Sequence, residues 1–431
     1  MRNSLWIVPL AFAVLAIALG IGMPTVDHHT RATIGISFGA DAARGVLGAI
    51  ASGMITFTGF VFSILLLAVQ FGSSQFSPRM LRRFLRDPTT KVALGIFMAT
   101  FIYALLVLRV VGTGTDKAFV PSNSISVALF LLLLSMLMFL RLISRTTQGL
   151  RVAAVLRDLG RDARRAVDRI YPELAVEAND EHALLPELLG PARLVVYRGA
   201  PGVLQSVDRR TLVDAARKAD AVIEQVPRIG ELMAPGSPLF RIHGDGDAIT
   251  DRWLGQAVAV GDERTMRQDP AFAFRLLADI SMKALSPGVN DPTTSTQALD
   301  QIDLLLRHIG RRRLAPGIGC DETGTVRFWY PTPSWEDYLS LAVDETRHYG
   351  AGSVQVTRRL RALLQDLREV VPPFRRAAID VKLELVDAAG DRAFPEQGDR
   401  AEAAERDRQG LGATEVLGAP RWPAAPFDGS P

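Results

Sequence analysis

Long apolar stretches occupy the first third of the chain. They run from Leu5 to Met23, from Val46 to Phe71, from Val92 to Val111 and from Ser122 to Leu140. A helix needs about 20 consecutive apolar residues to cross the hydrocarbon core of a bilayer. The pattern therefore predicts an α-helical membrane domain with four transmembrane helices over residues 1–145.

The first stretch has an alternative interpretation as a secretory signal peptide, with Arg2 as its charged start. Its apolar run is long, and no small-x-small cleavage pattern precedes Met23 and Pro24. Both features favour a helix that is retained.

Basic residues gather in two of the segments that flank these stretches. They are Arg79, Arg82, Arg83, Arg86 and Lys91 after the second stretch, and Arg141, Arg145 and Arg151 after the fourth. Arginine and lysine are enriched on the cytoplasmic side of membrane proteins. We therefore expect a multi-pass protein of the bacterial cytoplasmic (inner) membrane, with its N- and C-termini in the cytoplasm.

The segment after the second stretch is also amphipathic between Pro78 and Pro88. Its apolar side chains can enter the membrane interface while its arginines contact anionic lipid headgroups. The interfacial arginines of this hypothesis are Arg79, Arg82, Arg83 and Arg86. The simpler interpretation, an ordinary basic cytoplasmic loop, is compatible with it, and in both cases the expected partner is the lipid bilayer.

Small and polar residues recur along one face of the second stretch, at spacings of three, four or seven. They are Gly48, Ser52, Thr56, Gly59, Ser63 and Gln70. One interpretation is a seam between helices, because small residues let two backbones approach closely. The other is the lining of a polar pathway. No Asp, Glu, Lys or His lies in the middle of the four stretches, which argues against a proton pump or an ion-coupled carrier.

Composition and charge narrow the possible partners. The net charge is +3, and most of the positive charge is arginine spread through the chain. No basic stripe is interleaved with aromatic residues, so we expect no nucleic-acid partner. Cys320 is the only cysteine, which excludes an intrachain disulfide and fits a reducing cytoplasm.

After the fourth stretch the chain has the pattern of a soluble protein. Residues 146–190 predict a helical connector, continuing from the fourth stretch to Tyr171, and then a polar linker. Residues 191–262 alternate between strand-like and helical segments, and residues 263–380 are mainly helical. Residues 381–431 are rich in Ala, Gly, Pro and charge, which predicts disorder. We therefore expect a cytoplasmic α+β domain with a disordered tail.

The segment Arg228–Leu239 is a glycine-punctuated turn between short strands. It is similar to a turn in the small barrel of biotinyl and lipoyl carriers, although the lysine that those carriers modify is missing. The similarity concerns architecture alone, and it makes a β-barrel-like subdomain the alternative to an α+β subdomain over residues 191–262.

The string Ser286–Thr294 is the most distinctive one in the soluble part. Pro287 and Gly288 end one predicted helix, Asp291 caps the next, and Pro292 takes its first position. This interpretation makes the string a helix junction. The alternative is a ligand-facing loop, because helix N-termini bind anions. Its candidate residues are Ser286, Gly288, Asn290 and Asp291.

The chain shows no pattern of a known catalytic or metal site. Its six histidines are scattered, and none stands at a metal-ligand spacing. Glycine-rich phosphate-binding strings and the nucleophile elbow of hydrolases are absent from the sequence. We therefore expect no catalytic residues, no metal and no cofactor, and a protein that is not an enzyme.

Four strings occur together in this chain: Gly72–Arg79, Gly202–Asp208, Ala284–Pro292 and Tyr349–Ser353. Their combination resembles the bacterial predicted membrane protein family called domain of unknown function 2254. The resemblance extends to about Val371 and implies a topology without an activity. It also leads us to expect alanine at the positions that Ser281 and Ser295 occupy.

Two functional hypotheses follow. The first is an oligomeric channel-like or permeation protein, a homo-oligomer with a cytoplasmic regulatory domain, suggested by the small polar face of the second stretch. The second is a membrane-anchored sensor or scaffold whose cytoplasmic domain binds an unknown ligand or partner.

Overall fold

A computed structural model describes most of the chain. The described residues are 6–29, 38–75, 88–112, 119–149, 151–175, 192–244, 246, 248–314 and 317–412. Contacts between Cα atoms divide the chain into two compact units, Met1–Val155 and Leu156–Pro431.

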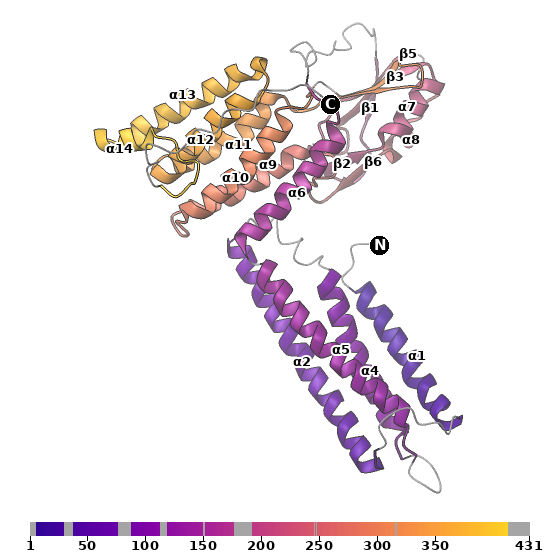
Figure 1. The fold of residues 1–431 in the computed structure, drawn as a ribbon. Coiled ribbons are helices and arrows are strands. Elements are labelled where there is room, and N and C mark those ends of the chain that lie inside the picture. Colours follow the sequence, from indigo (N-terminus) through magenta and orange to yellow (C-terminus); the bar gives the residue numbers. More distant parts are fainter. Residues whose placement is uncertain are drawn as a thin grey trace. The chain divides into compact units, whose positions relative to one another are not determined.

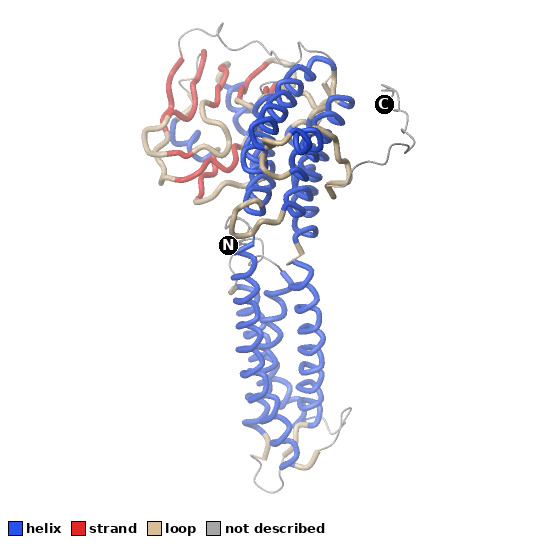
Figure 2. Tube along the Cα trace, turned by 90° about the vertical axis from the view of Figure 1, so that its left-hand side faces the viewer, coloured by secondary structure: helices blue, strands red, loops and turns tan. Residues whose placement is uncertain are grey.

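The first unit is a bundle of long apolar helices (Figures 1 and 2). They are α1 (Ile7–His29), α2 (Ala40–Gln75), α4 (Pro88–Val110) and α5 (Ser122–Gly149). Within the described residues, these four are long and apolar enough to cross a membrane. The expected membrane part of the fold is confirmed.

Helix α4 lies at the centre of this bundle, since it packs against α1, α2 and α5. Half of the residues in the most apolar part of α4 are buried, whereas 22% are buried in the corresponding part of α2. Glycines allow α1 and α4 to approach closely. A Cβ atom on Gly95 would lie 2.7 Å from the ring of Phe12, and one on Gly20 would lie 2.9 Å from Leu106.

Polar contacts also join these helices. The hydroxyls of Thr100 on α4 and Ser135 on α5 are 2.9 Å apart and buried. Near the end of α1, one carboxylate oxygen of Asp27 accepts from the backbone N–H and the hydroxyl of Ser124, at 2.9 and 2.7 Å. This carboxylate satisfies a free N–H group in the first turn of α5.

Helix α6 (Val152–Ile170) opens the soluble part. The sequence predicted one helix continuing from α5, but Arg151 is not helical and separates α6 from the residues before it. The apolar side of α6 is buried inside its own unit, with Leu159 and Val167 fully covered. Its polar side is tied to α10 (Pro292–Ile309) and the turn after it, because Asp168 accepts from His308 and Arg312 at 2.7 and 2.6 Å.

The strands of the second unit form two sheets. One has the order β1-β5-β3-β8-β7, in which β3 and β8 are parallel and the other pairs antiparallel. The other is antiparallel with the order β4-β2-β6. The strands are β1 (Ala192–Val196), β2 (Gly202–Val207), β3 (Ala221–Gln225), β4 (Leu232–Met233), β5 (Pro238–Gly244), β6 (Val258–Gly261), β7 (Gly317–Cys320) and β8 (Val326–Tyr330).

Two short helices belong to this β region, α7 (Arg209–Lys218) and α8 (Asp251–Gln256). Leu212 and Ala216 on α7 are fully buried in the core that the two sheets share. Residues 192–261 therefore contribute strands β1 to β6 to the two sheets. Strands β7 and β8 lie within the segment expected to be mainly helical, residues 263–380, and they complete the five-stranded sheet.

The remaining helices pack beside the sheets (Figure 1). Besides α10 they are α9 (Pro270–Ala284), α11 (Trp335–Gly350), α12 (Val354–Val370), α13 (Arg376–Ala393) and α14 (Gln397–Ala403), with a short 3-10 helix at Pro373–Arg375. The two serines that the family resemblance would replace by alanine meet in this core. The hydroxyls of Ser281 on α9 and Ser295 on α10 are buried and 2.7 Å apart.

The expected disorder from residue 381 is not what the structure shows up to residue 412. Helix α13 continues to Ala393, and the segment after α14 is fixed to α12. Buried Asp407 accepts from the backbone N–H groups of Gln409 and Gly410, both at 2.9 Å, and of Gly412 at 2.6 Å. Arg358 donates to the carbonyl of Gly412 at 3.1 Å. Composition does not reveal the bond between Arg358 and Gly412, because its two residues are 54 positions apart.

Candidate functional site

The small polar face of α2 points away from the bundle of its own chain. Ser52, Thr56, Gly59, Ser63 and Gln70 are exposed and Gly48 is partly exposed. The buried residues of α2 lie on the opposite side of the helix and include Leu47, Ile50, Met54 and Val61. A seam within one chain is therefore not the role of this face.

The hydroxyls on this face are bonded within α2 itself. Ser52 donates to the carbonyl of Gly48 at 2.8 Å, and Ser63 donates to that of Gly59 at 3.0 Å. Thr56 donates to the carbonyl of Ser52 at 3.3 Å. A Cβ atom on Gly48 or Gly59 would meet nothing within 4 Å. The face is therefore flat, and its hydroxyl oxygens can still accept hydrogen bonds from another molecule.

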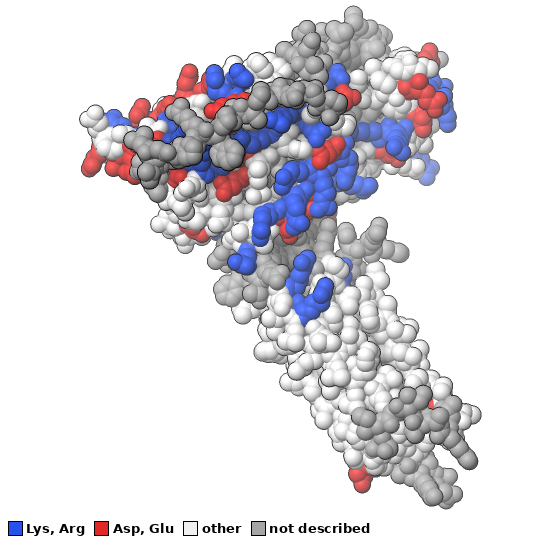
Figure 3. Space-filling model, in the orientation of Figure 1, with Lys and Arg blue, Asp and Glu red and all other residues white. Residues whose placement is uncertain are grey.

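The interfacial arginines Arg79, Arg82, Arg83 and Arg86 lie outside the described residues. Basic residues also gather on α6, where Figure 3 shows a blue band along the helix. Its exposed arginines are Arg157, Arg161, Arg165 and Arg169, spaced by four residues. Arg161 and Arg165 each pair with an aspartate three residues earlier on α6. The band is therefore partly neutralised by its own helix.

The string Ser286–Thr294 is a helix junction, as its proline and aspartate predicted. Asp291 is the N-cap of α10, where its carboxylate accepts from the backbone N–H and the hydroxyl of Thr294 at 3.0 and 2.6 Å. Ser286 donates to the carbonyl of Lys283, and exposed Asn290 has a left-handed backbone with φ of 46°. Gly288 has open space around it. The hydroxyl of Ser286 and the carboxylate of Asp291 thus form hydrogen bonds within the junction itself.

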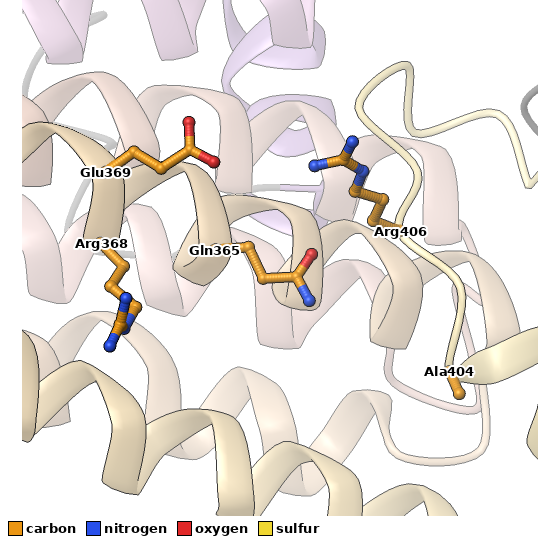
Figure 4. A pocket seen from close by; sticks show the side chains of 5 residues that line it. All are labelled: Gln365, Arg368, Glu369, Ala404 and Arg406. Carbon is orange, nitrogen blue, oxygen red and sulfur yellow. The ribbon is translucent and has the colours of Figure 1, made fainter. Parts of the chain in front are cut away.

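Among the described residues of the second unit, we consider two of the hollows that lie away from this string. One, of about 480 Å³, is lined by Gln365, Arg368, Glu369, Ala404 and Arg406. Figure 4 shows that Arg368 points away from Glu369 and Arg406, and its guanidinium is paired with Asp380 on α13 at 2.6 Å. This hollow is a surface groove in which the charged side chains do not point toward a common centre.

The smaller hollow, of about 330 Å³, lies where the β region meets the helices. Its polar side chains come from segments far apart in the sequence, and we call it the Arg209 hollow. They include Tyr171, Arg209, Arg228, Arg264, Asp269, Tyr330, Asp337 and Tyr338. The sequence did not predict this hollow because its tyrosines belong to no common motif. Among the described residues, no group of three or more His, Cys, Asp or Glu side chains is placed to hold a metal ion.

Comparison with known proteins agrees with this architecture. A family model described as "Predicted membrane protein (DUF2254)" matches residues 2–366. The chain belongs to this family. Two relatives in it are the "Uncharacterized protein Rv1290c" of Mycobacterium tuberculosis (strain ATCC 25618 / H37Rv) and the "Uncharacterized protein Mb1321c" of Mycobacterium bovis. Each is 32% identical over 425 residues, covering 93% of this chain and 79% of the relative. No solved structure matches.

The family match covers both units and confirms the resemblance seen in the four strings. It includes the small polar face of α2, the helix junction before α10 and every residue that lines the Arg209 hollow. The groove of Figure 4 extends beyond it, to Ala404 and Arg406. The family establishes a membrane protein that contacts lipid, and its description carries no activity.

Proposed function

We propose that this protein is a homo-oligomeric, channel-like permeation protein of the bacterial inner membrane. In the oligomer, α2 helices of neighbouring copies face one another through Gly48, Ser52, Thr56, Gly59, Ser63 and Gln70. The observation that carries this proposal is the outward direction of that face. It lies opposite to the side of α2 that packs in the bundle.

The chemistry of the face supports contact with other helices better than contact with lipid. Gly48, Ser52 and Thr56 follow one another at intervals of four, as do Gly59 and Ser63. This small-xxx-small spacing lets two helices approach within backbone distance in a membrane. Lipid chains, in contrast, gain nothing from the hydroxyl oxygens. Association of the helices therefore removes this polar surface from contact with lipid chains.

A polar path along α2 would be long enough to cross the bilayer. The helix has 36 residues, about 54 Å at about 1.5 Å per residue, whereas the hydrocarbon core is about 30 Å thick. Its hydroxyls at Ser52, Thr56 and Ser63 lie within the apolar span, which ends at Gln70. The face carries no charge, so the path would suit small polar molecules or partly hydrated ions without a coupling group.

The placement of arginines supports an orientation with both termini in the cytoplasm. In this orientation the second unit is cytoplasmic and can regulate the path. The orientation follows from the positive-inside rule. Reaction of an N-terminal and a C-terminal tag with an impermeant reagent in intact cells tests it, and labelling of either tag before lysis contradicts it.

The oligomer is tested by two glycine substitutions that differ in their surroundings. Gly48→Leu adds a side chain to the open face, so we expect it to weaken self-association at least about tenfold, or about 1.4 kcal/mol, with unchanged thermal stability. Gly95→Leu drives a side chain into Phe12, so we expect it to lower the thermal midpoint instead. The measurements are disulfide crosslinking of Ser52→Cys in membranes and thermal unfolding in detergent. Crosslinking that survives Gly48→Leu contradicts the proposed interface.

The path itself is tested by cysteine accessibility, for which the chain needs one preparatory change, Cys320→Ser. On that background, a water-soluble thiol reagent should modify Ser52→Cys and Ser63→Cys at least about ten times faster than Phe62→Cys, an exposed position beside the face. Reaction rates at aqueous and lipid positions differ because the reagent and the thiolate both require water. Equally slow labelling at all three positions, together with no conductance in planar bilayers, would contradict the proposed pathway.

The Arg209 hollow favours a second candidate function, a membrane-anchored sensor whose cytoplasmic unit binds a ligand. The observation for it is a cavity lined by three tyrosines and three arginines. The two functions are compatible, because a ligand in the second unit is one way to regulate the path.

A further inference from the structure

The geometry points to a binding site in the Arg209 hollow for a small organic anion, with one carboxylate or phosphate group on an aromatic or apolar body. Arg209 would bind the oxyanion, and Tyr171, Tyr330 and Tyr338 would surround the body. The inference concerns the second unit alone and does not depend on a path through the membrane.

Arg209 is the charge in the hollow that lacks a counter-charge. Its guanidinium lies over the ring of Tyr330, 3.8 Å from the ring centre, and donates to the Tyr330 hydroxyl at 2.7 Å. It makes no ion pair with any carboxylate of the described residues. A guanidinium has five N–H donors arranged to hold a planar oxyanion through two bonds at once. The donors that Tyr330 does not use are available to a ligand.

The other two arginines are already neutralised. Arg264 donates to buried Asp269, and Arg228 donates to Asp337 at 3.2 Å. The remaining carboxylate, that of Glu231, is exposed to water, which screens its charge. Three arginines and three carboxylates thus line the hollow, and Arg209 is the arginine among them that bonds to no carboxylate.

The walls provide an apolar contact surface. Tyr171 and Tyr338 are buried, with their hydroxyls 3.0 Å apart, so these hydroxyls bond to each other beneath the surface of the hollow. Pro331, Pro333 and Ile229 complete the apolar lining. Ligand sites commonly combine such walls with a few polar groups, in volumes upward of about 300 Å³. A volume of about 330 Å³ therefore fits a small molecule of one or two rings.

The electrostatic surroundings agree with an anion. Burial lowers the pKa of Arg209 and raises the pKa of Tyr330 and of Asp269. Each shift reports that the hollow solvates charge poorly, and a bound oxyanion would raise the pKa of Arg209 again. In such surroundings an ion pair with arginine is stronger than in water.

The test uses the full chain in detergent micelles and fluorine NMR of 4-fluorophenyl phosphate and 4-fluorobenzoate. We expect line broadening with a Kd of about 1 mM or tighter for at least one probe. Uncharged 4-fluorobenzyl alcohol should bind at least about tenfold more weakly than the better anion, and inorganic phosphate should compete with each anion that binds, because both would use Arg209. Empty micelles give the background from partition into detergent.

Variants locate the binding. Arg209→Gln should weaken the better probe about 10- to 100-fold, as the loss of a charge-assisted hydrogen bond predicts. Arg210→Gln, the neighbouring exposed arginine on α7 that does not line the hollow, should change it less than about twofold. Tyr330→Phe keeps the ring and removes the hydroxyl that orients Arg209, so we expect an intermediate loss.

The outcomes are decisive even if Arg209→Gln unfolds. In that case Arg209→Lys, which keeps the charge but loses the planar fork, and Tyr330→Phe carry the comparison with Arg210→Gln. Binding that is equal in all variants, or equal for the alcohol and the anions, overturns the site. No binding of either anion also overturns it.

Discussion

The two units of this protein satisfy their polar side chains in opposite ways. In the first unit, Ser52 and Ser63 bond to carbonyls one turn earlier in the same helix. In the second unit, arginine–carboxylate pairs join different helices, for example Arg359 to Asp303 and Arg361 to Asp387. A membrane leaves no water to share the cost of a charge, whereas in the second unit a pair such as Arg361 with Asp387 keeps one partner near solvent, since Asp387 is 48% exposed. The comparison shows that the links between helices are made by neutral hydroxyls and one carboxylate in the described part of the first unit, and by arginine–carboxylate pairs in the second.

The largest expected effect on stability comes from breaking an arginine–carboxylate pair between helices of the second unit. Asp303, 7% exposed, accepts from Arg307 at 2.6 Å and from Arg359 at 3.1 Å. Asp303→Asn leaves two arginines without this charge, so we expect the free energy of unfolding to fall by about 3 kcal/mol. The matched control is Asp300→Asn, because Asp300 also bonds Arg359 but is 49% exposed, and we expect a loss below about 1 kcal/mol.

Denaturant titration of the full chain in detergent, followed by tryptophan emission, measures both changes. Equal losses for the two variants would show that burial does not distinguish these carboxylates, and the contrast between the units would fail.

A smaller effect compares one buried hydroxyl pair from each unit. The pairs are Ser281 with Ser295 and Thr100 with Ser135, at 2.7 and 2.9 Å. A double-mutant cycle with alanine, or valine at Thr100, should give a coupling energy of about 1 kcal/mol for the serine pair. We expect about 0.6 kcal/mol for the pair between α4 and α5. A larger coupling in the first unit would reverse the ranking of the two environments.

The smallest effect concerns an aspartate in the turn between β7 and β8. Arg327 and Thr323 bond to Asp321 and hold its pKa well below its usual range. A depressed pKa stabilises the fold above the unfolded value of 3.8, and this contribution is lost as the pH falls below that value. Asp321→Asn should therefore flatten the acid limb of stability measured between pH 5 and about pH 2. An unchanged acid limb would assign acid sensitivity to other carboxylates.

Several features were predicted correctly because they depend on neighbours in the chain. The four apolar helices follow from length and hydropathy, and the junction before α10 follows from Asp291 and Pro292 at adjacent positions. Other features were missed or wrong because they depend on distant partners. Arg358 on α12 bonds to Gly412, in a segment that composition marks as disordered, and β8 pairs in parallel with β3, about 100 residues earlier.

By itself, the sequence determined that this is a membrane protein with four apolar helices, and which residues of α2 share a face, since helical periodicity is a local property. Only the tertiary structure decided that this face points outward, because the direction depends on which side of α2 the other helices cover. It also decided that Ser281 meets Ser295 and that Arg209 bonds to Tyr330 rather than to a carboxylate of the described residues. Such contacts join residues far apart in the chain, and no local pattern encodes the distance between them.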